Sequence, residues 1–210
     1  MLGLDPTTIL IRIITLVIAF TVHEFSHAWV ATMFGDNTPS AAGRLTLNPL
    51  VHLDVWGSLL LLLAGFGWAK PVPINPYAMR TRSGVMWTSL AGPFSNFLMA
   101  VVAAIPLRLG LVSVSGTSFL SQFVLEFMLI NLTLMLFNLI PIAPLDGEKI
   151  AEYVWPPAWG AVLEKLSRYG PMILLVLILL GNFGSFNILG AVINPPMINL
   201  ASLLLGIPRF

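Results

Sequence analysis

The chain has 210 residues, of which 57% are hydrophobic and 9% are charged, whereas soluble domains carry about 25% charged residues. This composition indicates an integral membrane protein and excludes an ordinary soluble domain. With a net charge of +1, the chain does not have the basic composition that a nucleic-acid-binding protein requires. The chain has no cysteine, so any metal site must be built from His, Asp and Glu.

Four apolar segments are long enough, or nearly so, to cross about 30 Å of hydrocarbon as helices. They are residues 9–34, 84–107, 119–140 and 170–206, and the last is divided near GNFGSFN into two, which gives about five spans. We therefore expect an all-α, polytopic helical bundle that forms one membrane-embedded domain over residues 1–210. Residues 9–150 form its core, and the C-terminal helices lie within 168–206. The first segment is longer than the apolar region of a signal peptide and is expected to be retained.

The apolar segment 56–69, WGSLLLLLAGFGWA, is too short to span. Its 14 residues reach about 21 Å as a helix, and Asp54 and Lys70 flank it. It is expected to form a re-entrant or interfacial hairpin. The segments on either side are rich in Pro, Gly and Asn, which predicts loops with short strands around residues 44–47 and 72–74.

The stretch TVHEFSH, residues 21–27, places two histidines and a glutamate inside the first apolar segment, where each ionisable group costs about 2.5 kcal/mol or more. On a helix, His23 and His27 project from one face and could bind one zinc ion through two imidazole nitrogens. Glu24 lies beside that face, where it could deprotonate a water molecule without binding the metal. A polar cluster that packs helices together is the alternative, but ionisable residues inside a membrane usually mark function.

A third metal ligand must come from elsewhere in the chain. Asp146 ends the stretch NLIPIAPLDG, in which two prolines each remove a backbone donor and Gly147 permits a positive φ. A helix cannot continue through this stretch, and non-helical backbone at membrane depth survives only beside protein or a wet cavity. The stretch therefore indicates an internal polar site, unless Asp146 simply follows a span that ends in a solvated turn. The other candidates are His52, Asp36, Asp54, Glu126, Glu148 and Glu152, of which Glu126 is expected to be an interfacial charge.

Other polar residues have two possible roles each. Asn96 lies in AGPFSN inside the span 84–107, where it either forms an interhelical hydrogen bond or, with Asn138, holds a substrate carbonyl or a developing oxyanion. His52 and Asp54 either stabilise their loop by hydrogen bonds or serve a second metal or a gate.

Three motifs occur in order: HEFSH at 23–27, GPFSN at 92–96 and NLIPIAPLDG at 138–147. With them the chain resembles the site-2 protease family of intramembrane zinc metalloproteases, in a compact form without a PDZ or CBS domain. The resemblance implies cleavage of transmembrane segments of other membrane proteins, often with release of a signalling domain. It also implies particular roles: Zn²⁺ bound by His23, His27 and Asp146, a general base at Glu24, and substrate positioning by Asn96 and Asn138.

Two rival functions use the same residues. A membrane metal-ion carrier could use the cluster as a transit site, although a carrier has no use for a glutamate fixed beside paired histidines. A prenyl-protein type of HExxH protease would take its third ligand from a downstream glutamate instead of Asp146.

The motifs also predict a topology. One metal ion can contact His23, His27 and Asp146 only if the C-terminal ends of 9–34 and 119–140 face the same side of the membrane. This arrangement requires segment 56–69 to turn back without crossing the membrane. We expect the N-terminus outside and the active site nearer the cytoplasm, in the plasma membrane of a prokaryote. Positive charges do not decide the orientation, because a re-entrant and a spanning hairpin give equally asymmetric distributions.

Overall fold

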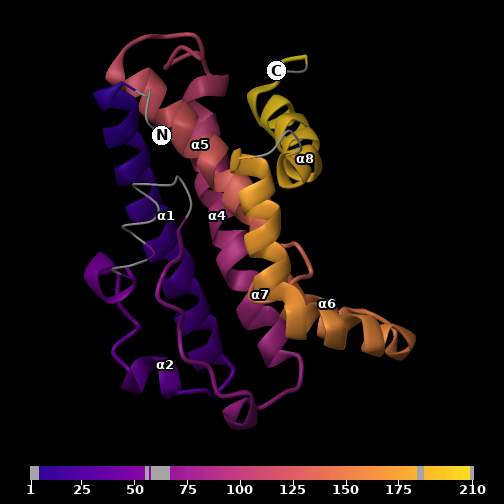
Figure 1. Cartoon of the computed structure of the whole chain (residues 1–210). Coiled ribbons are helices and arrows are strands. Elements are labelled where there is room, and N and C mark those ends of the chain that lie inside the picture. Colours follow the sequence, from indigo (N-terminus) through magenta and orange to yellow (C-terminus); the bar gives the residue numbers. More distant parts are fainter. Residues whose placement is uncertain (1–4, 55–56, 58–66, 184–186, 209–210) are drawn as a thin grey trace.

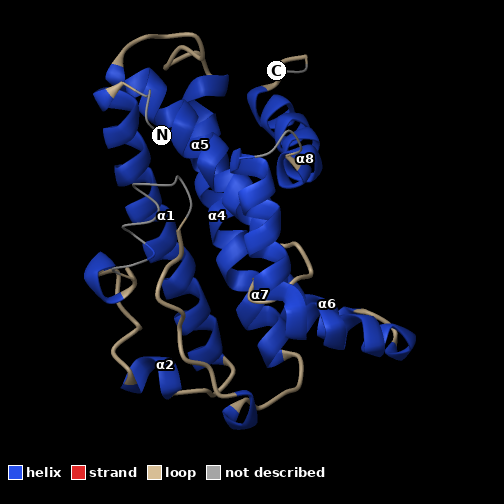
Figure 2. Ribbon diagram, in the orientation of Figure 1, coloured by secondary structure: helices blue, strands red, loops and turns tan. Residues whose placement is uncertain are grey.

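The structure is a computed structural model that describes residues 5–54, 57, 67–183 and 187–208. The helices are α1 (Pro6–Met33), α2 (Thr38–Ala41), α4 (Gly84–Arg108), α5 (Phe119–Asn138), α6 (Asp146–Val154), α7 (Gly160–Phe183) and α8 (Ile188–Leu205). Three short 3-10 turns, Pro49–Val51, Pro76–Ala78 and Pro157–Trp159, join them. Figures 1 and 2 show long helices side by side and loops between them, as expected for an all-α membrane protein.

Among the described residues, four helices are long and apolar enough to cross a membrane: α1, α4, α5 and α8. They match the first three predicted spans and the second half of the last one. The predicted span that begins at residue 170 lies within α7, whose first half carries Glu164, Lys165 and Arg168. A fifth span therefore stays a prediction.

Local sequence explains where the key helices begin and end. Asp5 caps α1, because its Oδ1 accepts a hydrogen bond from the Thr8 N–H at 3.0 Å, and Pro6 at the first helical position needs no partner for an N–H. Helix α5 ends at Asn138, shortly before Pro141 and Pro144, which cannot continue a helix.

The core of the bundle lies between α4, α5 and α8. Small side chains on α4 let the neighbouring helices approach closely, as is common between membrane helices. The buried residues of this core are Ala100, Ala103, Ala104 and Leu107 of α4, Met128, Leu132 and Met135 of α5, and Ala201 and Leu205 of α8.

Helices α1 and α5 run in the same direction, and α4 runs opposite to both (Figure 1). Near their N-terminal ends, Arg12 Nε of α1 lies 3.1 Å from Glu126 Oε2 of α5. Glu126, expected as an interfacial charge, is therefore one half of an ion pair. In its C-terminal half, α1 carries His23 and His27, which face Asp146 at the start of α6, shortly after α5 ends.

The predicted hairpin, residues 56–69, lies mostly outside the described residues, but its two ends are adjacent. Leu53 and Ala69 form an isolated antiparallel bridge, and the Lys70 N–H donates to the His52 carbonyl at 2.8 Å. Further on, the Arg80 N–H donates to the Phe34 carbonyl at 2.9 Å. The chain thus returns to the end of α1 that it left, and α4 begins on that side.

The short strands predicted at 44–47 and 72–74 do not form; both segments are described without strand structure. Prolines at 71 and 73 lack the N–H groups that a strand ladder needs. The polar groups of these segments pair with side chains instead. Arg44 Nη2, for example, donates to the Lys70 carbonyl at 2.8 Å.

Candidate metal centre

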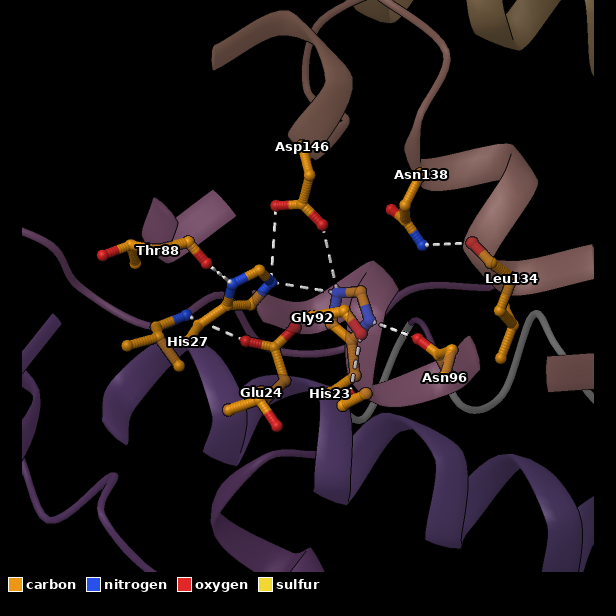
Figure 3. Close-up of polar contacts among 12 residues, drawn as sticks. His23, Glu24, His27, Thr88, Gly92, Asn96, Leu134, Asn138 and Asp146 are labelled. Atoms are coloured by element: carbon orange, nitrogen blue, oxygen red, sulfur yellow. Dashed lines mark hydrogen bonds and ion pairs between the residues drawn. The ribbon is translucent and has the colours of Figure 1, made fainter. Parts of the chain in front are cut away.

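Three side chains converge beside α1 to form a candidate metal centre (Figure 3). His23 Nε2 and His27 Nε2 lie 3.0 Å apart, as the four-residue spacing on a helix predicts. Asp146 Oδ2 lies 3.2 Å from His23 Nε2, and Asp146 Oδ1 lies 3.3 Å from His27 Nε2. Within the described ranges, this is the only group of three or more such residues whose ligand atoms are close enough to hold one metal ion.

The end of α5 and the start of α6 bring Asp146 to the histidines. Asp146 is the first residue of α6, and Gly147 follows it. A Cβ atom at Gly147 would lie 2.4 Å from the carbonyl oxygens of both Leu139 and Ile140. Gly147 permits a positive φ but does not adopt one. The glycine is instead required for its small size, because α6 starts directly against the end of α5.

Hydrogen bonds behind the imidazole rings fix their orientation and their tautomer. His27 Nδ1 lies 2.6 Å from the Thr88 carbonyl oxygen, and His23 Nδ1 lies 2.6 Å from Asn96 Oδ1. Both partners are acceptors, so each Nδ1 carries the proton and donates it. In the neutral ring, each Nε2 then presents a lone pair towards Asp146, which is the arrangement of metal-binding histidines.

Gly92 leaves room for the two rings. A Cβ atom at this position of α4 would lie 2.4 Å from His27 Nε2 and 2.6 Å from His23 Cε1. The glycine of the GPFSN motif therefore admits the imidazole rings of His23 and His27.

The donor atoms fit a divalent cation, and zinc in particular. Two imidazole lone pairs and a carboxylate face one another, and they repel unless a cation lies between them. Asp146 Oδ2 is buried and accepts no hydrogen bond within the described part of the chain. Such an oxygen is costly to leave unsatisfied. Nitrogen and oxygen ligands of this kind are those of catalytic zinc, which keeps a further position open.

Glu24 lies next to this group without belonging to it. Its Oε2 accepts a hydrogen bond from the Val72 N–H at 3.1 Å. Glu24 also lines a cavity of about 320 Å³ together with His23, His27 and Asp146. An ionisable carboxylate thus borders the space in which a substrate could meet the metal.

The three asparagines near the centre differ in position. Asn96 is fully buried; its Oδ1 accepts from His23, and its Nδ2 donates to Asn131 Oδ1 at 2.9 Å. In place of the expected contact with a substrate carbonyl, this geometry supports a role for Asn96 in orienting His23. Asn138 does line the cavity, while its Nδ2 donates to the Leu134 carbonyl at 3.0 Å. Sequence reasoning missed Asn131, although an amide inside an apolar span was a usable signal.

The remaining candidate ligands are engaged elsewhere. Glu148 accepts a hydrogen bond from Ser167, and Glu152 lies 3.3 Å from Lys149 Nζ. His52 Nε2 donates to the Thr46 carbonyl at 2.7 Å, and Asp54 Oδ1 accepts from the Gly57 N–H at 2.8 Å. For His52 and Asp54 these contacts support the loop-stabilising alternative.

Comparisons with known proteins agree with this chemistry. A family model described as "Peptidase family M50" matches residues 110–181, which include α5 and Asp146. The chain is 43% identical over 171 residues to "Putative zinc metalloprotease YwhC" of Bacillus subtilis, covering 79% of this chain and 78% of that protein. It is 32% identical over 174 residues to "Putative zinc metalloprotease Rip2" of Mycolicibacterium smegmatis, covering 75% of this chain but 62% of that protein. It is also 24% identical over 170 residues to "Zinc metalloprotease MJ0392" of Methanocaldococcus jannaschii, covering 80% of this chain and 42% of that protein. No solved structure matches the chain.

Proposed function

We propose that this chain, which belongs to peptidase family M50, is a zinc endopeptidase that cleaves peptide bonds in or near transmembrane segments of other membrane proteins. The observation that carries the proposal is the cluster of buried His23 and His27 with half-buried Asp146, beside Glu24 on the wall of the same cavity, among helices apolar enough to span a membrane. We further propose that residues 1–210 form one membrane-embedded domain.

The residues of the cavity have distinct tasks in this reaction. His23, His27 and Asp146 would hold zinc, which would supply the Lewis acidity needed to activate a water molecule and a peptide carbonyl. Glu24 accepts a proton from the attacking water and delivers it to the leaving amine, which is the work of a general base followed by a general acid. The Asn138 amide, on the cavity wall, is placed to donate to a substrate carbonyl oxygen.

A helical substrate must unwind before it can react, because its carbonyl groups are hidden in hydrogen bonds to the N–H groups four residues on. Backbone of residues 70–75, which borders the cavity through Pro71, Val72 and Ile74, offers an extended partner for the unwound segment. Prolines at 71 and 73 leave this partner with few N–H donors. The pairing therefore depends mainly on carbonyl groups of residues 72–75 that accept from the substrate, because the carbonyl oxygens of Lys70 and Pro71 accept from Arg44.

We propose that the protein lies in a prokaryotic plasma membrane with its active site towards the cytoplasm. The absence of native cysteine makes the orientation testable with single cysteines at Thr38, after α1, and Thr81, before α4. A membrane-impermeant thiol reagent should label neither position in intact cells and both after the membrane is opened. Labelling of both in intact cells would reverse the orientation, and labelling of only one would contradict the α1–α5 arrangement.

Comparison of membrane proteomes tests the activity itself. Cells that contain the wild-type chain should accumulate fragments of membrane proteins whose new ends lie in or near transmembrane segments. Cells with Glu24→Gln should lack these fragments at equal protein level. Identical fragment patterns would reject the protease, and zinc uptake by vesicles without any fragment would support a metal-ion carrier instead.

A further inference from the structure

A short extended segment, which we call the strap, touches the proposed general base. The strap is residues 70–75, KPVPIN, and it forms part of the cavity wall. Because Pro71 and Pro73 have no N–H, Val72 carries the only backbone donor among residues 71–73. That N–H donates to Glu24 Oε2 at 3.1 Å.

A buried arginine holds the first end of the strap. Arg44, only 4% exposed, donates from Nη2 to the carbonyl oxygens of Lys70 at 2.8 Å and Pro71 at 2.5 Å. Its Nη1 donates to the Val51 carbonyl. The guanidinium group presents its donors in a rigid planar fork, so it holds several acceptors in a fixed geometry that the rotatable ammonium of lysine does not impose. Arg44 therefore fixes the backbone immediately before Val72.

A buried aspartate holds the other end. Asp36 is fully buried, and its Oδ2 accepts from the Asn75 N–H at 2.7 Å while its Oδ1 accepts from the Thr38 N–H at 2.9 Å. Burial raises the pKa of Asp36, but the hydrogen bonds from Thr38 and Asn75 outweigh it and leave the pKa below its ordinary value. The carboxylate is thus ionised at neutral pH, where its hydrogen bonds are charge-assisted.

We propose that Arg44 and Asp36 are positioning residues that fix the strap so that the Val72 N–H sets the orientation of the Glu24 carboxylate. Neither residue borders the cavity among the described lining residues, so each acts through the strap. A base is efficient only when held in the geometry of proton transfer. The effect on catalysis rests on the proposed function of Glu24. The fixing of the strap by Arg44 and Asp36, which is the mechanical part of the inference, does not.

A pair of substitutions at Val72 isolates the hydrogen bond. Val72→Pro removes the N–H in a segment whose next residue, Pro73, already favours extended backbone at position 72. Val72→Ala shortens the side chain and keeps the N–H, so it serves as the reference. Relative to Val72→Ala, Val72→Pro should lower kcat about tenfold or more at equal zinc content, with KM changed less than kcat. Equal kcat in the two variants would overturn the proposal.

Combined substitutions show whether Arg44 and Asp36 act through the same bond. Arg44→Gln and Asp36→Asn should each lower kcat in the wild-type background, and Arg44→Lys should restore part of the loss. In the Val72→Pro background neither should lower kcat further, because the bond they support is already gone. Losses of the same size in both backgrounds would show that these residues act elsewhere. Arg82→Gln, at an exposed arginine of the same loop region, is the control and should leave kcat unchanged.

Hydrogen exchange of the full-length protein tests the mechanical part without any proteolysis. In a peptide covering residues 71–73, Val72 contributes the only exchangeable backbone amide. We expect it to exchange slowly in the wild type and about tenfold faster or more in Arg44→Gln and Asp36→Asn, with no change in Arg82→Gln. Unchanged exchange of the Val72 amide in folded Arg44→Gln would overturn the proposal that Arg44 fixes the strap. Absence of cleavage by the wild type, with this exchange pattern intact, would instead refute the proposed function alone.

Discussion

Helix α1 makes two polar contacts of very different character, one with α5 and one with Asp146 at the start of α6. In the N-terminal contact, Arg12 and Glu126 lie 3.1 Å apart with side chains 33% and 29% exposed. In the C-terminal contact, His23 and His27 of α1 face Asp146, just beyond α5, and both histidines are buried. Helix α1 thus carries a partly exposed ion pair in its N-terminal half and a cluster with two buried histidines in its C-terminal half.

The two contacts differ in whether their own side chains satisfy all of their charges and hydrogen-bonding groups. Arg12 supplies two donors to the Glu126 carboxylate, at 3.1 and 3.3 Å, so charge and hydrogen-bonding capacity balance. At the other contact, two imidazole lone pairs and a carboxylate converge, and Asp146 Oδ2 accepts no hydrogen bond within the described chain. Protein groups alone balance the charges and hydrogen bonds of the first contact, whereas the second contact needs a cation to balance them. Four predictions probe this contrast, from the largest expected effect to the smallest.

Asp146→Asn should have the largest effect on metal binding, because a neutral amide is a poorer zinc ligand than a carboxylate. We expect zinc affinity to fall about 100-fold or more. The matched control is Glu126→Gln, which changes the other contact of the same helices and should keep about one zinc per chain. Metal content after dialysis against a mild chelator measures both. Loss of zinc on substitution of Glu148 or Glu152, with retention in Asp146→Asn, would contradict the assignment.

Gly92→Ala should distort the cluster without removing a ligand. The added Cβ would meet His27 Nε2 at 2.4 Å, so one ring or α4 must shift. Zinc affinity should fall about 10- to 100-fold, as expected when ligand orientation is lost. Gly160→Ala, where a Cβ meets nothing within 4 Å, is the control in the same affinity titration. Equal affinities for the two variants would show that the space at Gly92 does not matter.

Asn131→Ala should weaken zinc binding about tenfold, because Asn131 orients Asn96, which in turn orients His23. Asn138→Ala provides the contrast. Its amide does not contact the histidines, so zinc affinity should be unchanged while turnover falls. A competition titration with a zinc indicator distinguishes them. Weaker zinc binding in Asn138→Ala than in Asn131→Ala would reverse the assigned roles.

Glu126→Gln should have the smallest effect. A partly exposed ion pair contributes about 0–1 kcal/mol, so the thermal unfolding midpoint should fall by a few degrees at most. The double variant Arg12→Gln, Glu126→Gln should be no less stable than Glu126→Gln alone, because it removes the unpaired arginine. A large loss of stability in the double variant would show that this contact is as demanding as the metal centre.

The sequence predicted those parts of the centre that depend on short spacing. The interval between His23 and His27 fixes a common helix face, and prolines at 141 and 144 end α5 before Asp146. The membrane helices could be predicted from the sequence as well, because their apolar segments must span a fixed hydrocarbon thickness.

Other parts depend on contacts between distant segments and were not predictable in this way. The hydrogen bond between His23 and Asn96 joins α1 to α4, as the interhelical alternative for Asn96 expected, but only the packing of those helices shows that its partner is a histidine of the metal centre. Strands expected at 44–47 and 72–74 failed for a related reason. The prolines of the strap lack the N–H groups that a strand pairing needs, and the Arg44 side chain binds carbonyl groups of the strap instead. Strand propensity does not account for such side-chain hydrogen bonds.

The zinc content and the proteolytic activity of Glu24→Gln, measured on the same purified sample, test the central claim most directly. Glu24 is expected to move protons and not to bind the metal. The account therefore predicts about one zinc per chain, as in the wild type, together with loss of cleavage of a transmembrane substrate by at least about 100-fold. Cleavage near the wild-type rate would contradict the mechanism, and loss of zinc from the variant would contradict the ligand set of His23, His27 and Asp146.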